Sequence, residues 1–162
     1  MKKIIVLSDS HGNVNNMIYA VREEKPDMII HLGDCWGDAL RLKREFPKIP
    51  MECVPGNCDY VNEPMARTLR IEDMDVLICH GHLYYVKMEL NTLQNAAQAQ
   101  KVDVVLFGHT HKVYYDKHNG ITYLNPGSIG APGFRVPPSY GILTLDGEAG
   151  TAEVNVKYIE FT

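Results

Sequence analysis

The chain has 162 residues, of which 45% are hydrophobic and 22% are charged, and its formal net charge is −4. This length can bury a sizeable core without disulfides or metals, so we expect a single domain over residues 1–162. The acidic balance argues against a broad basic surface that would hold long nucleic acid. It remains compatible with a small phosphate ligand held in one local site.

The N-terminal segment is too poor in apolar residues to direct export or membrane insertion. Its apolar run covers only residues 4–7, and no stretch of the chain approaches the roughly 18 apolar residues of a membrane span. The four cysteines contain no Cys-x-x-Cys pair, which indicates free thiols in a reducing compartment. We therefore expect a cytoplasmic protein that does not associate with membranes.

Four short segments rich in Ile, Val and Leu are expected to form buried strands. They are residues 3–9, 27–34, 51–57 and 103–109. Residues 68–82 are expected to form a hairpin, with residues 75–80 as its buried arm.

Three helices are expected between these strands. Val14, Met17, Ile18 and Val21 follow the helical period, and Pro26 should close that helix. A short second helix over residues 39–46 is expected to be capped by Asp38. Residues 88–100 are expected to be helical because they are rich in good helix formers.

The last third of the chain changes to β patterns. Residues 112–128 predict a hairpin around an Asn-Gly turn, and residues 140–161 predict another with a cleanly alternating second arm. Residues 130–139 are rich in Gly and Pro and are expected to be a surface loop. The chain is thus α/β giving way to β, which is compatible with two packed sheets and helices outside them.

Five of the expected strands end in Asp, Asn or His. These polar strand ends contain Asp9 and His11, then Asp34, then Asn57, Cys58 and Asp59, then His80 and His82, and last His109 and His111. Sites in open α/β sheets form outside the carboxyl ends of the strands, where loops converge. We therefore expect these side chains to meet, with neighbouring glycines allowing sharp turns and close approach to a ligand.

Carboxylate, amide and imidazole ligands suit first-row dications. The seven candidate ligands exceed the four of a tetrahedral zinc site, which favours two ions that share a bridging carboxylate. Two dications carry +4 and Asp9 with Asp34 supplies −2, so the residual +2 would attract a phosphate and acidify a bridging water. The pattern indicates two-metal hydrolysis, with Mn²⁺ as the first expectation and Ni²⁺, Fe²⁺, Co²⁺ or Zn²⁺ as alternatives.

In this order, the motifs Asp-x-His, Gly-Asp, Gly-Asn-x-Asp, His-Gly-His and Gly-His-x-His resemble those of the calcineurin-like metallophosphoesterases. The resemblance runs from residue 4 to about residue 129, includes Asn-Pro-Gly-Ser-Ile at residues 125–129, and points to the small, cap-less bacterial and archaeal phosphodiesterase branch. It implies a four-layer α/β/β/α sandwich of two mixed sheets flanked by helices. It also implies one ion on Asp9, His11 and His111, a second on Asn57, His80 and His109, and Asp34 as the bridge.

The chain departs from the wider family at Cys58. Many members have a histidine there that contacts the phosphate and can protonate the leaving oxygen, whereas the small branch resembles this chain in having a cysteine. A thiol with an ordinary pKa of about 8.5 is a weaker donor and carries no positive charge. We hypothesise weak leaving-group protonation, which favours activated or aryl phosphodiesters, and leave open whether Cys58 donates a proton.

Other polar residues allow more than one interpretation. His31 is expected to be a core histidine or to lie behind a ligand, and His118 to be a solvated turn residue. His82 either supports the neighbouring motif histidine or lines the substrate pocket, while Asp59 is expected to orient a ligand or cap a turn. Arg135 would reach phosphate if it matches a basic residue that relatives carry, although its spacing here differs.

We therefore expect a metal-dependent phosphodiesterase that cleaves small phosphodiesters by attack of a metal-bridging hydroxide. The expected catalytic residues are Asn57, Cys58, His80 and His109. Two alternatives stay open: a weak or inactive scaffold module, similar to a retromer subunit of this fold, and a nuclease of the superfamily. The sequence leaves open the natural substrate, the metal loaded in the cell, and whether the chain forms a homo-oligomer.

Overall fold

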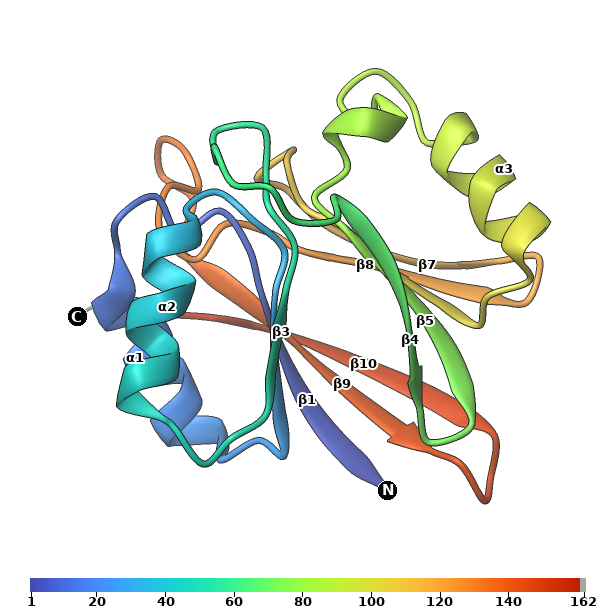
Figure 1. The fold of residues 1–162 in the computed structure, drawn as a ribbon, viewed down its shortest axis with the longest axis horizontal. Coiled ribbons are helices and arrows are strands. Elements are labelled where there is room, and N and C mark those ends of the chain that lie inside the picture. The colour runs from blue at the N-terminus through green and yellow to red at the C-terminus, as the bar shows by residue number, and fades with distance from the viewer. Residues whose placement is uncertain (161–162) are drawn as a thin grey trace.

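The computed structural model describes residues 1–160 as alternating strands and helices followed by β hairpins (Figure 1). In chain order the elements are β1 (Lys2–Leu7), α1 (Val14–Glu24), β2 (Met28–His31), α2 (Trp36–Glu45), β3 (Met51–Cys53), β4 (Ala66–Ile71), β5 (Met74–Cys79), the 3-10 helix η1 (His82–Tyr84), α3 (Asn91–Gln100), β6 (Val104–Leu106), β7 (Val113–His118), β8 (Ile121–Pro126), β9 (Ser139–Asp146) and β10 (Thr151–Tyr158). The expected second arm of the last hairpin ran to Phe161, which lies outside the described residues.

Two mixed sheets pack face to face in the middle of the molecule. Their strand orders are β10-β9-β1-β2-β3 and β4-β5-β6-β8-β7. Ile30 and Leu143 of the first sheet share a buried apolar cluster with Val76, Leu106 and Leu124 of the second. This shared cluster is the core between the sheets, and it buries one face of each.

Helices cover the outer face of each sheet, as Figure 1 shows. Met17 of α1 and Leu42 of α2 pack in one cluster with Ile29 of β2. Leu93 of α3 packs in another with Leu77 of β5. The expected four-layer α/β/β/α sandwich is confirmed.

The register of the parallel strands brings their carboxyl ends to one edge of the molecule. Leu7 of β1 lies level with His31 of β2, which lies level with Cys53 of β3. In the second sheet, Ile78 of β5 lies level with Leu106 of β6. The loops that follow these five strands therefore emerge together.

The strands are shorter than expected, two helices begin elsewhere, and one strand differs in burial. Helix α2 begins at Trp36, and Asp38 lies in its first turn, where its carboxylate accepts a hydrogen bond from the Gly12 N–H (2.6 Å). The N-terminus of α2 is capped from a distance instead, because Asp59 accepts from the Trp36 N–H (2.8 Å). Helix α3 begins only at Asn91, and β3 is a half-buried edge strand rather than a buried one.

None of the helices in the described part of the chain is long and apolar enough to span a membrane.

Candidate metal centre

The loops after β1, β2, β5 and β6 bring two groups of metal-ligating side chains together. The first group is Asp9, His11 and His111, and the second is Asp34, His80 and His109. Within each group, the candidate ligand atoms all lie within 4.8 Å of one another. The structure thus brings together six of the seven residues expected as ligands.

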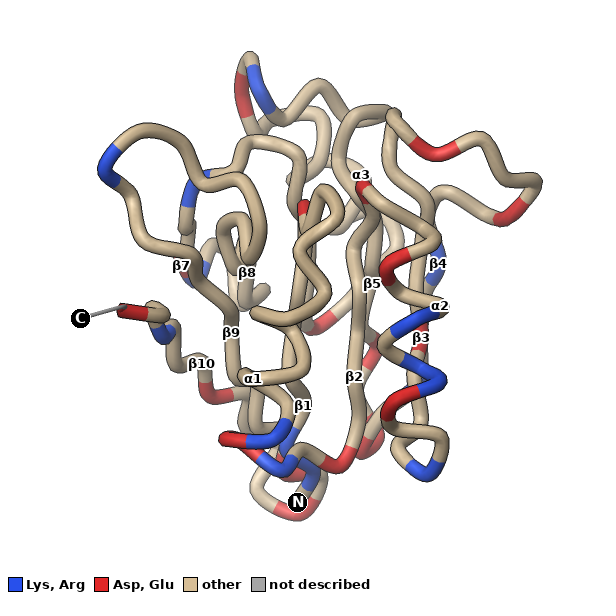
Figure 2. Tube along the Cα trace, turned by 90° about the vertical axis from the view of Figure 1, so that its left-hand side faces the viewer, with Lys and Arg blue, Asp and Glu red and all other residues tan. Residues whose placement is uncertain are grey.

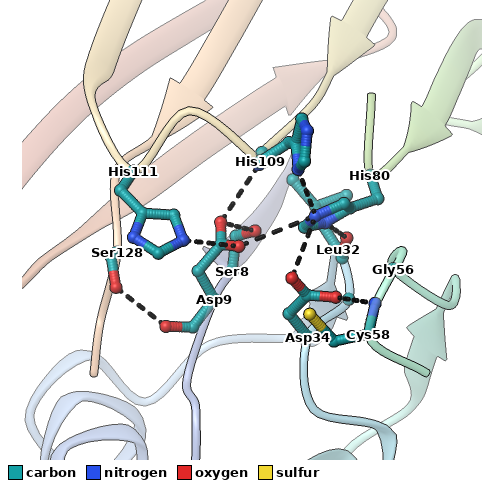
Figure 3. A network of polar contacts seen from close by, with 12 residues as sticks. Ser8, Asp9, Leu32, Asp34, Gly56, Cys58, His80, His109, His111 and Ser128 are labelled. Carbon is teal, nitrogen blue, oxygen red and sulfur yellow. Dashed lines mark hydrogen bonds and ion pairs between the residues drawn. The ribbon is translucent and has the colours of Figure 1, made fainter. Parts of the chain in front are cut away.

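The two groups adjoin through their carboxylates (Figure 3). Nε2 of His80 lies 3.7 Å from Oδ1 of Asp9 and 3.4 Å from Oδ2 of Asp34. Nε2 of His11 lies 3.8 Å and 3.9 Å from the same two oxygens. Each carboxylate therefore faces an imidazole of the other group, which suits two ions in adjacent positions.

Asp9 has one carboxylate oxygen that is satisfied and one that is not. Its Oδ2 accepts hydrogen bonds from the Ser8 hydroxyl (2.7 Å) and the His109 N–H (3.1 Å). Its Oδ1 is buried and has no hydrogen-bond partner within residues 1–160. Three imidazole Nε2 atoms surround this oxygen, the nearest that of His111 at 3.3 Å. A buried oxygen without a partner is costly, and a divalent cation shared with these imidazoles would satisfy it.

Two of the histidines are oriented by backbone carbonyls. Nδ1 of His80 lies 2.8 Å from the Leu32 carbonyl oxygen, and Nδ1 of His111 lies 2.8 Å from that of Ala131. A carbonyl oxygen can only accept, so each Nδ1 donates, and in the neutral imidazole the lone pair on Nε2 is then available to a cation beside the carboxylates. A second hydrogen bond of this kind is the usual support of a metal-binding histidine.

Burial and the contacts between neighbouring candidate ligands set the protonation states of these carboxylates and imidazoles. Burial alone would raise the pKa of Asp9 and of Asp34, but His111 and His80 beside Asp9, and His80 beside Asp34, hold both pKa values below the ordinary one. Burial and the neighbouring His80 lower the pKa of His109 to about 4. Ionised carboxylates beside a neutral imidazole are the protonation states that metal binding requires.

Five of the candidate ligands have a left-handed backbone, which residues other than glycine rarely adopt. Their φ angles are 55° at Asp9, 43° at His11, 47° at Asp34, 73° at His109 and 62° at His111. Such conformations persist where the surrounding structure enforces them, and they concentrate at functional sites. The strain therefore coincides with the candidate metal centre.

Two glycines let the backbone approach the carboxylates closely. A β-carbon on Gly56 would overlap Oδ1 of Asp34, and one on Gly108 would overlap the Ser8 hydroxyl. The backbone can therefore come this close at these two strand ends only because glycine has no β-carbon.

Asp59 holds the two turns around Asp34. Its Oδ2 accepts from the N–H groups of Asp34 (3.0 Å) and Gly56 (2.8 Å), in addition to its cap on Trp36. These contacts fix the turn after β2 against the turn after β3. Through these contacts Asp59 orients Asp34, which is one of the two roles that the sequence predicts for Asp59.

Asn57 and Cys58 lie at the surface of the turn after β3. Both side chains are exposed, and the Cys58 N–H donates to Oδ1 of Asp34 (3.0 Å). Coordination by Asn57 stays a prediction. Slight burial and the nearby Asp34 carboxylate raise the pKa of the Cys58 thiol, so the ordinary thiol pKa assumed from the sequence is too low.

His82 lies beside the centre, and Arg135 is exposed in the loop after β8. The ring centroid of His82 is 5.6 Å from that of His80 and 6.2 Å from that of His109, and its Nδ1 is buried without a partner in the described residues. Both roles expected for His82 fit this position. Arg135 is exposed and its guanidinium lies 5.0 Å from the ring centroid of Phe134, so its contact with phosphate stays a prediction.

Contacts within the chain explain the positions of His31 and His118, without a bound metal or substrate. His31 is buried, its Nδ1 accepts from the Gly33 N–H (3.1 Å), and its Nε2 therefore donates to the Ser10 hydroxyl (3.1 Å), which confirms a core histidine behind the centre. His118 is the last residue of β7 rather than a turn residue, and its ring lies 6.4 Å from that of Tyr123.

Three buried polar residues support the centre and were not expected as site residues. The Ser128 hydroxyl donates to the Asp9 carbonyl (2.8 Å), and Ser8 contacts the Asp9 carboxylate as described. Asn125 donates to the Gly108 carbonyl (3.0 Å) and to the Thr110 hydroxyl (2.9 Å). The only signal in the sequence was the Asn-Pro-Gly-Ser segment, whose role depends on contacts with distant strands.

The family model of the calcineurin-like phosphoesterase superfamily domain matches residues 1–148. The chain belongs to this superfamily. Among its relatives, "Probable metallophosphoesterase YsnB" of Bacillus subtilis is 34% identical over 152 residues, which cover 91% of this chain and 87% of the relative. "Phosphodiesterase YfcE" of Escherichia coli is 30% identical over 174 residues, covering 90% and 89%.

Solved structures agree with the superfamily assignment. A Streptococcus pneumoniae protein described as a predicted phosphoesterase matches with a TM-score of 0.74 and 25% identity, over 96% of this chain and 98% of its own. Vps29 of Entamoeba histolytica in complex with zinc matches with a TM-score of 0.75 over the same shares, and at 17% identity it shows the fold alone. Members of the superfamily use divalent metals, and this chain has two groups of side chains that could hold them.

Proposed function

We propose that this phosphoesterase is a phosphodiesterase that hydrolyses small phosphodiesters with two divalent cations. One cation is assigned to Asp9, His11 and His111, the other to Asn57, His80 and His109, and Asp34 is shared. The buried Oδ1 of Asp9 is the observation that carries this proposal, because it lies within 3.8 Å of three imidazole nitrogens and has no hydrogen-bond partner within residues 1–160.

In this proposed reaction the cations and the residues of the chain have different roles. When bound, two cations would polarise the phosphoryl oxygens and lower the pKa of a water between them. The residues of the chain fix positions: Leu32 and Ala131 orient the imidazoles of His80 and His111. Exposed Asn57 is proposed to orient the phosphate.

Cys58 is proposed to face the reacting phosphate from the turn beside Asp34. In the chain without cations, slight burial and the Asp34 carboxylate raise the pKa of this thiol, so it is protonated at neutral pH. The thiol can therefore donate a hydrogen bond to the leaving oxygen, although it supplies no positive charge.

The distribution of charge supports a small substrate rather than long nucleic acid. Helix α2 carries basic and acidic residues together, and Lys and Arg are intermixed with Asp and Glu around the end of the molecule that carries the N-terminus (Figure 2). A nucleic-acid surface would instead gather basic residues along one face. We propose Mn²⁺ as the first metal to test and a cytoplasmic location.

The test is to replace Asp34 and His109 separately with Ala. Each variant should lose at least one bound Mn²⁺ by elemental analysis, and its turnover of bis-p-nitrophenyl phosphate should fall by a factor of about 10³ or more, because phosphoryl transfer here depends on metal charge and positioning. His118→Ala is the matched control, since it removes an imidazole outside the centre. Wild-type activity in either variant would refute the assignment. Tight metal binding by the wild type without turnover of any diester would favour the scaffold alternative.

A further inference from the structure

A pocket of about 400 Å³ lies against the loop that carries His109 and His111. Residues from three segments line it: the segment 86–90 before α3, Phe107 just after β6, and the segment 110–114 that leads into β7. Thr110 lines the pocket and stands in the chain between the two candidate ligands. Its hydroxyl accepts hydrogen bonds from Asn125 (2.9 Å) and from the Lys112 N–H (3.1 Å), which hold this wall of the pocket in place. The pocket therefore adjoins the metal centre through a fixed loop.

The apolar part of the lining suits a flat ring. Phe107 and Tyr114 stand with ring centroids 6.0 Å apart at an interplanar angle of 55°. Val86 and Leu90 line the same pocket and pack in the same apolar cluster as the two rings. Phe107 and Val86 are buried, so a planar group would stack on the half-buried side chains of Tyr114 and Leu90.

The polar part of the lining is cationic. Lys87 and Lys112 both line the pocket and are exposed, and neither ammonium group pairs with a carboxylate among residues 1–160. The carboxylate of Asp116 is engaged by the Tyr114 hydroxyl (3.4 Å) and the Lys117 N–H (2.8 Å). In a chain of net charge −4, two unpaired ammonium groups beside a phosphoesterase centre favour an anionic occupant.

We propose that this pocket, the Lys87–Lys112 pocket, holds the organic group of the diester and selects an aromatic group that carries a second negative charge. The apolar lining takes the ring, and the two ammonium groups take its carboxylate or phosphate. This inference rests on the proposed phosphodiesterase function, and it names the substrate class of the same centre.

A pair of chromogenic diesters tests the selection. Both release p-nitrophenolate, and they retain either a 4-carboxyphenyl group or the neutral 4-carbamoylphenyl group of similar size. With Mn²⁺, the wild type should hydrolyse the carboxyphenyl ester with a kcat/KM roughly three- to tenfold higher, mainly through KM, as expected for two exposed charge pairs. The double variant Lys87→Gln, Lys112→Gln should bring this ratio to about one.

Lys117→Gln is the matched control, because Lys117 lies on β7 but does not line this pocket. It should keep the wild-type ratio. A wild-type ratio of one or less overturns the inference, and so does a double variant that keeps the wild-type ratio. Failure of the wild type to hydrolyse either ester would instead count against the proposed function.

A binding measurement tests the pocket without turnover. In the full chain treated with chelator, 4-hydroxybenzoate should shift the amide resonances of Thr110, Lys112 and Val113, and 4-hydroxybenzamide should shift them at least threefold less. In the double variant, the two compounds should shift these amide resonances by equal amounts. Equal shifts by both compounds in the wild type would overturn the selection for an anionic ring even if the diesterase activity is established.

Discussion

Gly108 shows how much of the metal centre depends on the absence of a single side chain. It lies two residues after β6 and packs against Ser8 and Asp9, which follow β1 of the first sheet. A β-carbon there would overlap the Ser8 hydroxyl and come within 3.0 Å of Oδ2 of Asp9. Its carbonyl is also held by Asn125 (3.0 Å). The loop that carries His109 therefore cannot retreat from Asp9 without losing this contact.

We predict that Gly108→Ala weakens Mn²⁺ binding by about 10- to 100-fold, the usual cost of disturbing residues that orient metal ligands. The added methyl group must displace Ser8 or the His109 loop. Calorimetric titration with Mn²⁺ measures the change. Gly37→Ala is the control: a β-carbon on Gly37 in α2 meets nothing, so affinity should hold and the helix should gain about 0.5–1 kcal/mol of stability. Unchanged affinity in Gly108→Ala would contradict the steric argument.

Cys58 supports a second prediction at the scale of one residue. Its thiol is exposed, and the pKa is raised by slight burial and by Asp34, so it offers a neutral donor beside the proposed ligands. Cys58→His should increase turnover of dialkyl diesters, whose alkoxide leaving groups are poor, more than turnover of aryl diesters with good leaving groups, because imidazolium is the stronger acid. The slope of log(kcat/KM) against leaving-group pKa measures this. An identical slope in wild type and variant would show that Cys58 does not limit protonation.

At the scale of elements, the last turn of α1 is fastened to three strands through one carboxylate. Glu24 is buried and accepts hydrogen bonds from the Tyr140 hydroxyl of β9 (2.7 Å) and from Nζ of Lys157 of β10 (2.9 Å), while Nζ of Lys3 of β1 lies 3.2 Å away. Burial alone would raise the pKa of Glu24, but these three contacts outweigh it and hold the pKa below 4.5. The network lies in the outer layer and contacts none of the candidate ligands.

We predict that Glu24→Gln lowers the free energy of unfolding by about 1–3 kcal/mol at pH 7, because two ammonium groups lose a buried carboxylate. A carboxylate with a depressed pKa contributes stability above its unfolded pKa, near 4.5, and the contribution is lost as pH falls through the folded value. The difference between variant and wild type should therefore narrow below about pH 4.5. Urea unfolding at pH 7 and at pH 3.5 measures it.

Glu45→Gln is the control for this prediction, since Glu45 pairs with Arg22 at an exposed position (2.7 Å). An exposed pair of this kind contributes little, so the change should stay below about 1 kcal/mol at both pH values. A Glu24→Gln variant that behaves like Glu45→Gln would show that the network does not stabilise α1.

At the scale of the whole molecule, the metal centre joins the two sheets. Asp9, His11 and Asp34 follow strands of the first sheet, whereas His80, His109 and His111 follow strands of the second. A cation bound to either group would therefore hold both sheets, and its binding energy would add to the stability of the native state.

We predict that Mn²⁺ at about 100 times its Kd raises the free energy of unfolding by roughly 2.7 kcal/mol, and that excess chelator reverses the gain. Thermal unfolding with and without Mn²⁺ measures the shift in Tm. In Asp34→Ala the shift should be much smaller. An equal shift in wild type and Asp34→Ala would mean that Mn²⁺ binds elsewhere.

Much of the metal centre could be predicted from the sequence because its information is local. A short apolar run followed by Asp, Asn or His identifies a strand end, and parallel strands place their carboxyl ends at one edge. For this reason the strand ends that carry Asp9, His11, Asp34, His80, His109 and His111 could be named in advance, while the choice among their polar residues and the four-layer sandwich came from the family resemblance. Residues 125–129 strengthened the resemblance without revealing that Ser128 supports Asp9.

Only the tertiary structure decided the contacts that join segments far apart in the chain. The start of α2 depends on Asp59, 23 positions away from Trp36, and the Lys87–Lys112 pocket depends on three separate segments. The unpartnered Oδ1 of Asp9 likewise becomes visible only when His11 of the same loop and His80 and His111 of two other loops surround it. Motifs record which ligand types a strand end carries, but orientation, burial and charge pairing arise from packing between strands, and a local pattern does not contain them.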